Sequence, residues 1–535
     1  MSGTLSRSKP STIACDLQDA SIDLDAMRRQ LRHELLELVG GLGGNVALVL
    51  DPRTAGLLSH VVSIEQLRSA GVSKIHYISA KLETPCKTIL YLLRDQLKHV
   101  QWLCDHYHDA AASPKKFILC MVPRRSVVCE KLLEGEGLYG EVEIHEWYFD
   151  WVALDQDLVS MDLPQSFRQC SLQGDRSSVY SVALFLDRLQ KWFGDFTTIR
   201  GKGRIAFEVS QLLRDLQSKR APSNIANIHR LILVDRTVDL VTPLLTQHTY
   251  EGLLDEVFEI RHGSVKVSKK TACLEADAPP IPDSSKPGSI NPSSSSSSPS
   301  PPQDEAMIQV PLNSSDALFK QIRDLNIAAI PSFLKQKATE IKQTKEQVRT
   351  LKTLWEIKQL TSKISDLLPH QRTLLTHISF AERIQKISNE ANFRNFVVAE
   401  QAELSGDTSC MDLLTTMMDK DEPLVKVLRL ACLRSLCVGG FPPKEFDAFR
   451  EQLLHTYGFD HLFSLYHLEK LGLLFSSGPK LAPFRQIAKQ LQLLHPAVDV
   501  HKASHPAYTY SGYSPLSVRY VEKACAPAWI EQSDA

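Results

Sequence analysis

The side chains most able to act in catalysis or binding follow one apolar run near the middle of the chain. The run from Arg230 to Val234 has the character of a buried strand, and Asp235, Arg236 and Asp239 come at its carboxyl end. Because α/β domains place functional groups at this end of their strands, the Asp-Arg-x-x-Asp series could supply catalytic carboxylates. The alternative is a hydrogen-bonded turn that locks the crossing from a sheet into a helical domain. We favour the turn, because no nucleophile or metal set accompanies these residues.

Glycine-rich segments would support a rival function, a nucleotide or phosphate hydrolase on an α/β domain, if they formed a phosphate-binding loop. The segment from Gly40 to Gly44 precedes a strand-like run instead of following one, and the segment from Arg200 to Gly203 lacks the Walker spacing. An ordinary turn is the better interpretation of each. The sequence contains no Gly-x-Ser-x-Gly elbow, so a serine hydrolase has no support either.

Two patterns resemble metal ligands. His145 begins a His-Glu pair like that of a zincin helix, but Phe149 stands where the second His is needed. Cys104, His106 and His108 would share a face only on a strand and lack a fourth ligand, so we interpret them as a mixed polar helix end. We therefore predict no metal, no cofactor and no enzyme activity.

The composition is that of a soluble protein of several domains, with 535 residues of which 43% are hydrophobic and 23% charged. The 61 Lys and Arg against 62 Asp and Glu give a formal charge of −1, which removes general long-range attraction to nucleic acid. The sequence shows no long apolar run and no signal peptide, and its 11 cysteines have no repeated spacing. We expect a cytosolic chain without a disulfide scaffold.

Strands alternating with helices are predicted for the first part of the chain. A helix is predicted over 22–39, and short apolar runs predict strands at 45–50, 74–78, 88–93, 117–122 and 142–145. This alternation predicts a parallel sheet covered on both faces and ending near residue 150. Helices are predicted next at 177–194 and 204–217. This part of the chain offers only two strands, one at 230–235 and an edge strand at 151–154, which are too few for a second covered sheet. Either other strands return from far along the chain, or this domain is incomplete.

The remaining chain has helical periodicity. The Ser- and Pro-rich residues 276–304 predict a disordered surface insertion. From 316 to about 475 the pattern is helical, with breaks predicted at Pro331, Pro369 and the pair Pro442 and Pro443. Two more helices are predicted at about 480–494 and 515–526.

The stretch from 231 to 256 resembles the signature of the SM family, the Sec/Munc proteins that work with SNAREs in membrane fusion. In that signature a strand ending in Asp-Arg-x-x-Asp is followed by Thr-Pro and a Tyr-Glu-Gly-Leu-x-Asp-Glu motif, and the matching residues here are Asp235, Arg236, Asp239, Pro243, Tyr250, Glu251 and Gly252. Motifs beginning at Val122, Asp157, Val425 and Tyr508 resemble the vacuolar protein sorting-associated protein 33 branch, nearer its A type. The resemblance runs from about residue 25 to 526.

This resemblance implies an arch of two parallel-sheet α/β domains, the second incomplete at the C-terminus, and an inserted all-α domain whose concave side holds SNARE helices. The implied boundaries are a flexible N-terminus at 1–21, α/β domain 1 at 22–150, the first part of α/β domain 2 at 151–250, helical domain 3 at 251–475 and a truncated return to domain 2 at 476–535. It further implies a non-enzymatic SNARE chaperone in the HOPS and CORVET tethers. Such a protein would be peripheral on late endosomes and lysosomes, and also on early endosomes.

A basic helical hairpin is the candidate SNARE contact. Residues 335–363 carry a local charge of +5 and have amphipathic spacing, which suits a partner helix. The alternative is a solvated basic face packed on its own apolar stripe, which is the commoner outcome. Given the family resemblance we assign the contact to Lys335, Lys342, Lys345, Arg349 and Lys352.

A second candidate surface surrounds Gly458, where aromatic residues crowd the end of a helix. Exposed rings at such a turn often anchor a partner, but they could equally be core residues between two helices. This region resembles the one that, in proteins of the vacuolar sorting branch, docks the sixteenth vacuolar sorting protein. The resemblance carries that role to Arg450, Phe459 and Leu462.

The chain departs from the family pattern after its last predicted helix. SM chains continue past the segment from Pro515 to Arg519 into a further strand, a Gly-Gly turn and a final helix, which are missing before Ala535. We expect a shortened form, either a splice variant or an incomplete gene model, whose second sheet exposes apolar edges. A regulatory protein that has lost tethering is a further alternative.

Overall fold

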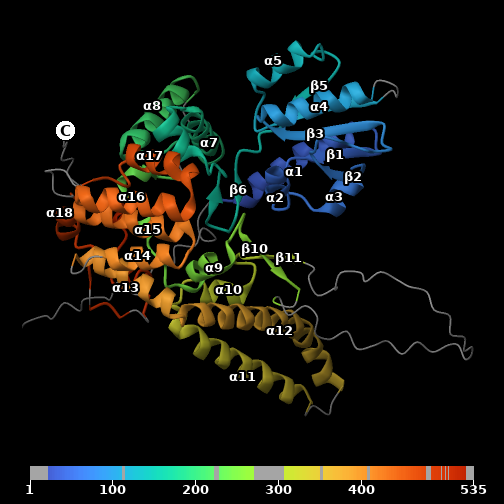
Figure 1. Cartoon of the computed structure of the whole chain (residues 1–535). Helices are drawn as coiled ribbons and strands as arrows, with labels where there is room; N and C mark the ends of the chain where they lie inside the picture. The colour runs from blue at the N-terminus through green and yellow to red at the C-terminus, as the bar shows by residue number, and fades with distance from the viewer. Residues whose placement is uncertain are drawn as a thin grey trace, which may run out of the picture. The chain divides into compact units, whose positions relative to one another are not determined.

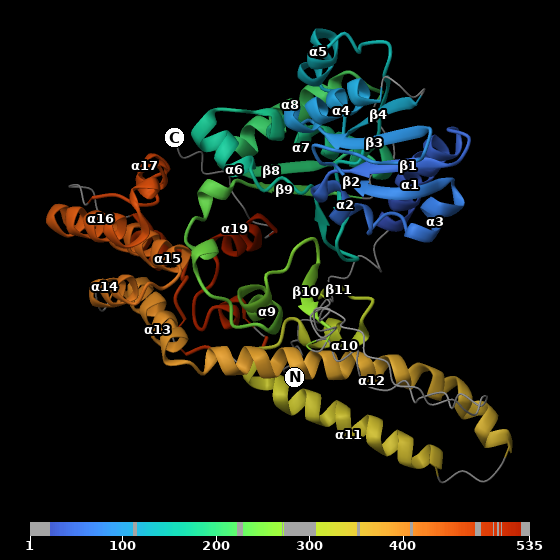
Figure 2. The same ribbon diagram turned by 45° about the vertical axis from the view of Figure 1, so that its right-hand side comes forward.

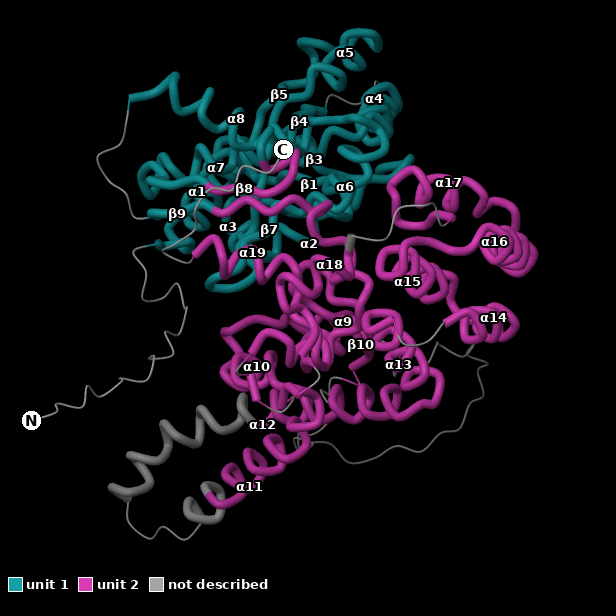
Figure 3. The backbone as a smooth tube through the Cα atoms, turned by 90° about the vertical axis from the view of Figure 1, so that its left-hand side faces the viewer, with its two compact units in different colours: residues 1–199, 207–231 teal, residues 200–206, 232–535 magenta. Residues whose placement is uncertain are grey.

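The computed structural model describes residues 22–110, 115–221, 228–269, 271, 307–349, 354–406, 410–476, 483–495, 497–499, 502–503 and 505–525, without the side chains of 344–349, 354–370 and 483. The predicted flexible N-terminus at 1–21 and the insertion at 276–304 lie outside these residues. Internal contacts divide the chain into two compact units, coloured separately in Figure 3: residues 1–199 with 207–231, and residues 200–206 with 232–535. The finer division into three domains stays a prediction.

A five-stranded parallel sheet forms the centre of the first unit (Figure 1). Its order is β2-β1-β3-β4-β5, with β1 at Val46–Leu50, β2 at Val72–Tyr77, β3 at Thr88–Arg94, β4 at Lys116–Val122 and β5 at Glu143–Glu146. Every residue of β1 is buried, as its unbroken apolar run predicts for a central strand. The predicted parallel sheet is confirmed.

Helices cover both faces of this sheet. The side chains of Leu48 and Leu90 pack with α1 (Leu24–Gly40), α2 (Pro52–Leu58) and α3 (Ile64–Ser69). Those of Val49 and Tyr91 point to the opposite face, against α4 (Leu97–Asp109) and α5 (Val127–Gly135). Because neighbouring residues of a strand face opposite sides, two separate cores form on the two faces.

The first unit continues with a small antiparallel pair, β6 (Val152–Ala153) and β7 (Val159–Ser160). The predicted edge strand at 151–154 is wrong as part of a second sheet, because Val152 pairs with β7 alone among the described strands and packs with Trp151 into the core of α1. The other elements are α6 (Ser166–Arg168), the π-helix η2 (Gln169–Gln173), α7 (Ser177–Phe193) and, from residue 207 onward, α8 (Arg204–Ser218).

A second sheet consists, within the described residues, of β8 (Thr198–Lys202) and β9 (Arg230–Val234). The interpretation of 200–203 as an ordinary turn is wrong, because its first three residues extend β8 and the amide of Asp235 donates to the Lys202 carbonyl over 3.0 Å. Only Gly203 turns, with φ +99°. The residues of β9 are half-buried or exposed, in contrast to the fully buried β1.

The second unit begins with two 3-10 turns, η3 (Arg236–Val238) and η4 (Thr242–Leu244), followed by α9 (Tyr250–Phe258). An antiparallel pair that the sequence analysis missed comes next, β10 (Ser264–Ser268) with β11 (Met307–Pro311). Then follow α10 (Ala317–Ile322), η6 (Ile327–Ala329), α11 (Ile330–Arg349) and α12 (Leu354–Ser388). Figure 2 shows α11 and α12 side by side as a long hairpin.

The predicted break at Pro369 is wrong, because α12 runs through it. A proline inside a helix removes one backbone hydrogen bond, and the rest of a 35-residue helix can outweigh that loss. Pro331 and Pro443 instead lie at helix starts, where no such bond is lost.

Short helices complete the second unit, and most of them share one core. They are α13 (Ala391–Ser405), α14 (Met411–Asp419), α15 (Leu424–Arg434), η7 (Ser435–Gly439), α16 (Pro443–Tyr457), η8 (Phe459–His461), α17 (Leu462–Lys470), α18 (Pro483–Gln490), η9 (Pro506–Thr509) and α19 (Leu516–Cys525). Their core also contains Val241 from the signature stretch and Tyr513 from near the end of the chain. The second unit therefore closes on itself through segments far apart in sequence.

Candidate interaction surfaces

The two aspartates of the signature stretch act as acceptors for backbone amides. Asp235 accepts from the amide of Thr237 over 3.0 Å and from that of Ile205 over 2.8 Å. Asp239 accepts from the amide and hydroxyl of Thr242 over 3.0 and 2.7 Å. Both carboxylates are buried, so these donors offset the cost of removing them from water. The geometry is that of a structural turn.

Asp239 also reaches the other end of the chain. Its second carboxylate oxygen accepts from the amide of Ser517 over 2.9 Å, at the start of α19. The hydroxyls of Thr242 and Tyr513 lie 3.3 Å apart beside it. Arg236 is exposed and donates to the carbonyl of Asp239 over 3.4 Å.

The later signature residues begin α9. Thr249 caps this helix by accepting from the amide of Gly252 over 3.3 Å, and Glu251 pairs with Arg323 over 2.8 Å. Gly252 is required by space, because a Cβ there would lie 2.3 Å from Cβ of Gln247. A hollow of about 670 Å³ beside these residues is lined by Pro243, Glu251, Gly252, Arg429 and Tyr508, among others.

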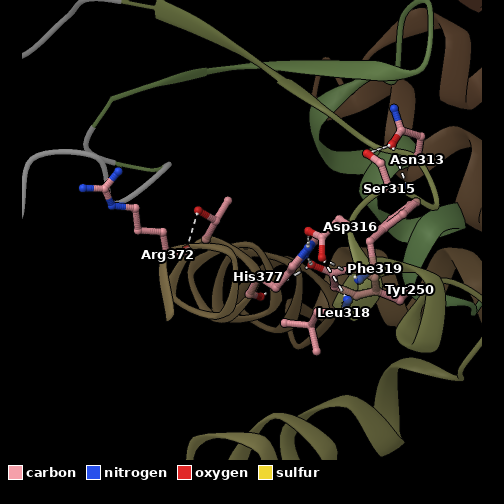
Figure 4. Close-up of polar contacts among 9 residues, drawn as sticks. Tyr250, Asn313, Ser315, Asp316, Leu318, Phe319, Arg372 and His377 are labelled. Carbon is pink, nitrogen blue, oxygen red and sulfur yellow. Dashed lines mark hydrogen bonds and ion pairs between the residues drawn. The ribbon is translucent and has the colours of Figure 1, made fainter. Parts of the chain in front are cut away.

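Tyr250 connects the signature stretch to the base of the hairpin (Figure 4). Its hydroxyl lies 2.9 Å from Nδ1 of His377 in α12, and Nε2 of His377 lies 3.0 Å from a carboxylate oxygen of Asp316. Burial, together with the charge of Asp316, raises the pKa of Tyr250 well above its usual value. The phenol therefore stays protonated and donates to Nδ1, which leaves the ring proton on Nε2 facing the carboxylate.

Asp316 in turn caps α10, accepting from the amides of Leu318 and Phe319 over 2.9 and 3.3 Å. The ring of Phe319 stacks on His377 with centroids 5.9 Å apart. One chain of contacts, from buried Tyr250 and His377 to half-buried Asp316, thus fixes α9, α10 and α12 together.

The described part of the hairpin presents its lysines to solvent. Lys335 and Lys342 are exposed, while Leu334 is buried and Ile341 packs against the same core. This arrangement suits a partner contact and equally the solvated basic face. The side chains of Lys345 and Arg349 lie outside the described residues, as does Lys352 altogether.

An exposed apolar patch covers η8 and the start of α17. The exposed fractions are 68% for Phe459, 43% for Leu462, 72% for Phe463 and 60% for Tyr466. The alternative that these are core residues is therefore wrong for all four. Arg450 lies on α16, 3.6 Å from Glu469 of α17, and is thereby held near the patch. Contiguous exposed aromatics of this kind mark interaction sites in soluble proteins.

A buried ionic group was missed by the sequence analysis. Glu400 of α13 accepts from the amide and hydroxyl of Thr246, each over 3.1 Å, and lies 3.4 Å from Arg429. Arg429 also forms two bonds to Glu256 of α9, at 2.9 and 3.0 Å. Burial raises the pKa of Glu400 to about 7, against the opposing effects of Arg429 and Thr246. The motif beginning at Val425 contains Arg429, and this was the available signal.

The residues that resembled metal ligands have structural contacts. His106 is buried in α4 with Nδ1 3.1 Å from the hydroxyl of Tyr91, and Cys104 is buried beside it. His145 lies in a strand, not in a zincin helix. Within the part of the chain that the structure describes, no group of three or more His, Cys, Asp or Glu side chains could hold a metal, and no helix is long and apolar enough to cross a membrane.

A family model described as the Sec1 family matches residues 46–535. The chain belongs to the Sec1 family. This member is 33% identical over 527 residues to the vacuolar protein-sorting-associated protein 33 homolog of Arabidopsis thaliana, covering 97% of this chain and 83% of the relative. It is 32% identical over 529 residues to vacuolar protein sorting-associated protein 33A of Rattus norvegicus, covering 97% of this chain and 85% of the relative. The predicted SM family and its vacuolar sorting branch are confirmed.

Solved structures share the fold of this Sec1-family protein. The SM protein Vps45 in complex with the Qa SNARE Tlg2 aligns with a TM-score of 0.56 at 17% identity, covering 92% of this chain and 86% of that chain. The Unc18–syntaxin 1 complex from Monosiga brevicollis aligns with a TM-score of 0.56 at 14% identity, covering 92% and 85%. The predicted α/β plus helical fold class is confirmed by these alignments.

Proposed function

We propose that this chain is a non-enzymatic chaperone that binds SNARE proteins and promotes their assembly in vesicle traffic. Its family and its relatives named for vacuolar protein sorting support this function. Two proteins of the same fold were solved with a Qa SNARE and with syntaxin 1. The rival hydrolase gains no support from the glycine-rich segment 200–203, because residues 200–202 belong to strand β8.

The observation that carries the SNARE proposal is the anchored hairpin, whose base is fixed by buried contacts while Lys335 and Lys342 remain exposed. A fixed base lets a basic face meet a partner helix in a defined orientation at low entropic cost. We expect Glu at both positions to weaken binding of a purified endosomal SNARE bundle about tenfold or more, with a reduced dependence on salt.

The matched control reverses two other exposed lysines of the second unit, Lys386 and Lys444. This variant has the same change in net charge and should bind like the unmodified chain. A second hairpin variant replaces Lys345, Arg349 and Lys352 by Glu. Binding that survives both hairpin variants would remove the hairpin assignment, and no SNARE binding by the unmodified chain would remove the proposed function.

We further propose that the apolar patch docks the sixteenth vacuolar sorting protein, which would bring the chain into HOPS- and CORVET-type tethers on late endosomes, lysosomes and early endosomes. Two exposed side chains of this patch, Phe459 and Leu462, would become anchors on burial, each worth about 1.5–3 kcal/mol. Replacing both by Ala should weaken capture of that subunit by at least about 100-fold without lowering stability. The role of Arg450 is to flank these anchors.

Val398 and Val425 provide the control for this experiment, with exposed fractions of 63% and 69% on the same unit. Their double Ala variant removes exposed apolar surface elsewhere and should leave capture unchanged. Equal capture by the patch variant and the unmodified chain would contradict the tether assignment while leaving SNARE binding untouched.

A further inference from the structure

A second hollow in the helical unit has a lining unlike that of the signature stretch. Its volume is about 640 Å³, and it lies where the end of α13 meets α18 and the segment after it. The lining residues are Leu404, Ser405, Arg485, Ala488, Lys489, Gln492, Leu494 and His495. Within the described part of the chain, the lining contains cationic and neutral polar groups but no carboxylate.

Two cations line this hollow from one face of α18. Arg485 and Lys489 are four residues apart, so they lie on the same side of the helix, and both are exposed. Among the described residues, neither forms an ion pair with a carboxylate. Ala488 of the same helix and Leu404 of α13 are buried beneath them. Unpaired charges above an apolar floor favour an anionic ligand.

The guanidinium of Arg485 lies against the backbone of a glycine. Gly406 ends α13 in the left-handed conformation, with φ +77°. A Cβ at this position would lie 2.2 Å from a terminal nitrogen of Arg485, so only glycine lets the guanidinium lie against this backbone. The position of a planar guanidinium matters for phosphate, because its paired N–H groups match two phosphate oxygens.

His495 adds a neutral donor on the same hollow. Its Nε2 lies 2.8 Å from a guanidinium nitrogen of Arg519, which can only donate, so the ring proton belongs on Nδ1. Arg519 itself is paired with Glu522 over 2.8 Å and contributes little net charge. The hollow thus combines two cations with a histidine N–H, the Gln492 amide and the Ser405 hydroxyl.

We propose that this hollow binds a compact polyphosphorylated anion of the inositol phosphate class. The two cations stand four residues apart on one face of α18 with neutral donors around them, so they can contact two phosphate groups of one small ring at once. The site is separate from the hairpin and the apolar patch, so its test does not depend on SNARE or tether binding.

The experiment titrates the full chain with inositol hexakisphosphate by calorimetry at about 0.1 M salt, where surface charge is screened beyond about 10 Å. Replacing Arg485 and Lys489 together by Gln should weaken binding at least about 30-fold, because two charge-assisted contacts are lost. The control replaces two exposed lysines of the same unit, Lys420 and Lys444, by Gln and should bind like the unmodified chain.

Two further probes distinguish the source of the ligand. Vesicles containing phosphatidylinositol bisphosphate test a lipid headgroup, and binding to them that is lost in the Arg485→Gln, Lys489→Gln variant supports the site with a lipid source. Binding of inositol hexakisphosphate alone, lost in the same variant, supports a free anion. Equal weakening in both double variants, binding of neither probe, or binding of a phosphoserine peptide in their place would overturn the proposal.

Discussion

Replacing Tyr250 by Phe removes one hydroxyl from the base of the hairpin and tests whether its bond holds α12. This hydroxyl is fully buried and donates to Nδ1 of His377 over 2.9 Å. Its loss leaves Nδ1 as a buried acceptor without its donor, which costs about 1–3 kcal/mol. Since 1.4 kcal/mol corresponds to a factor of ten, the base of α12 should open about 5 to 150 times more often.

Hydrogen exchange of amides 371–388 and 317–322, followed by mass spectrometry, measures this opening. The control is Tyr508→Phe, whose hydroxyl donates to the Asp324 carbonyl over 2.8 Å at a partly exposed position. Water can replace that bond, so its loss should cost no more than about 0.5 kcal/mol. If both variants exchanged at the same rate across α12, the buried bond would not be what anchors the hairpin.

Acid unfolding provides an independent test of the same anchor. Burial raises the pKa of Asp316, but the His377 hydrogen bond and two backbone amides outweigh it and hold that pKa below the usual 3.8. A lowered carboxyl pKa stabilises the fold above pH 3.8, and this stabilisation is lost as the pH falls below that value. His377→Ala should therefore make the acid-induced loss of stability shallower than in the unmodified chain.

Two further predictions concern residues that contact the signature stretch, Glu400 and Gly203. Burial raises the pKa of Glu400 to about 7, so the folded state keeps this proton at pH values where the unfolded state has lost it. The free energy of unfolding should therefore fall by about 2–3 kcal/mol between pH 4.5 and 7, and Glu400→Gln should abolish this fall. Unfolding curves at pH 5, 6, 7 and 8 that keep the same slope in the variant would contradict the prediction. Gly203→Ala should lower the free energy of unfolding by about 3 kcal/mol or more in a denaturant titration, because its Cβ would lie 2.3 Å from Cβ of Asp235. The control is Gly174→Ala, which has a positive φ but open space around it and should cost only about 1–2 kcal/mol in the same titration.

The strands of the first sheet were predictable because their burial is continuous. Runs such as Val46–Leu50 are apolar at every position, and a helix of that length would be too short. The β10–β11 pair carried a weaker signal, since only alternate residues such as Val265 and Val267 are buried. Its partner strand, β11, begins only at Met307, so the sequence contains no short hairpin turn that would predict the pair.

The candidate surfaces could not be predicted from the sequence, and the reason is different. Phe449 and Phe459 are ten positions apart in one aromatic-rich stretch, yet the first is buried and the second is 68% exposed. Composition cannot separate them, because exposure depends on which helix face meets the common core. The bond between Tyr250 and His377 joins residues 127 positions apart, and local spacing contains no information on such a pair.

The contact between Asp239 and the start of α19 sets a limit on when the second unit can fold during synthesis. The core that contains Val241 also contains Leu516, about 275 positions later. A ribosome adding about 5–20 residues per second needs roughly 14–55 s to make that stretch. Once α13 to α17 have been made within this interval, their apolar faces lack their last partners until α19 follows. The nascent chain should therefore engage chaperones long before it meets any membrane-fusion partner.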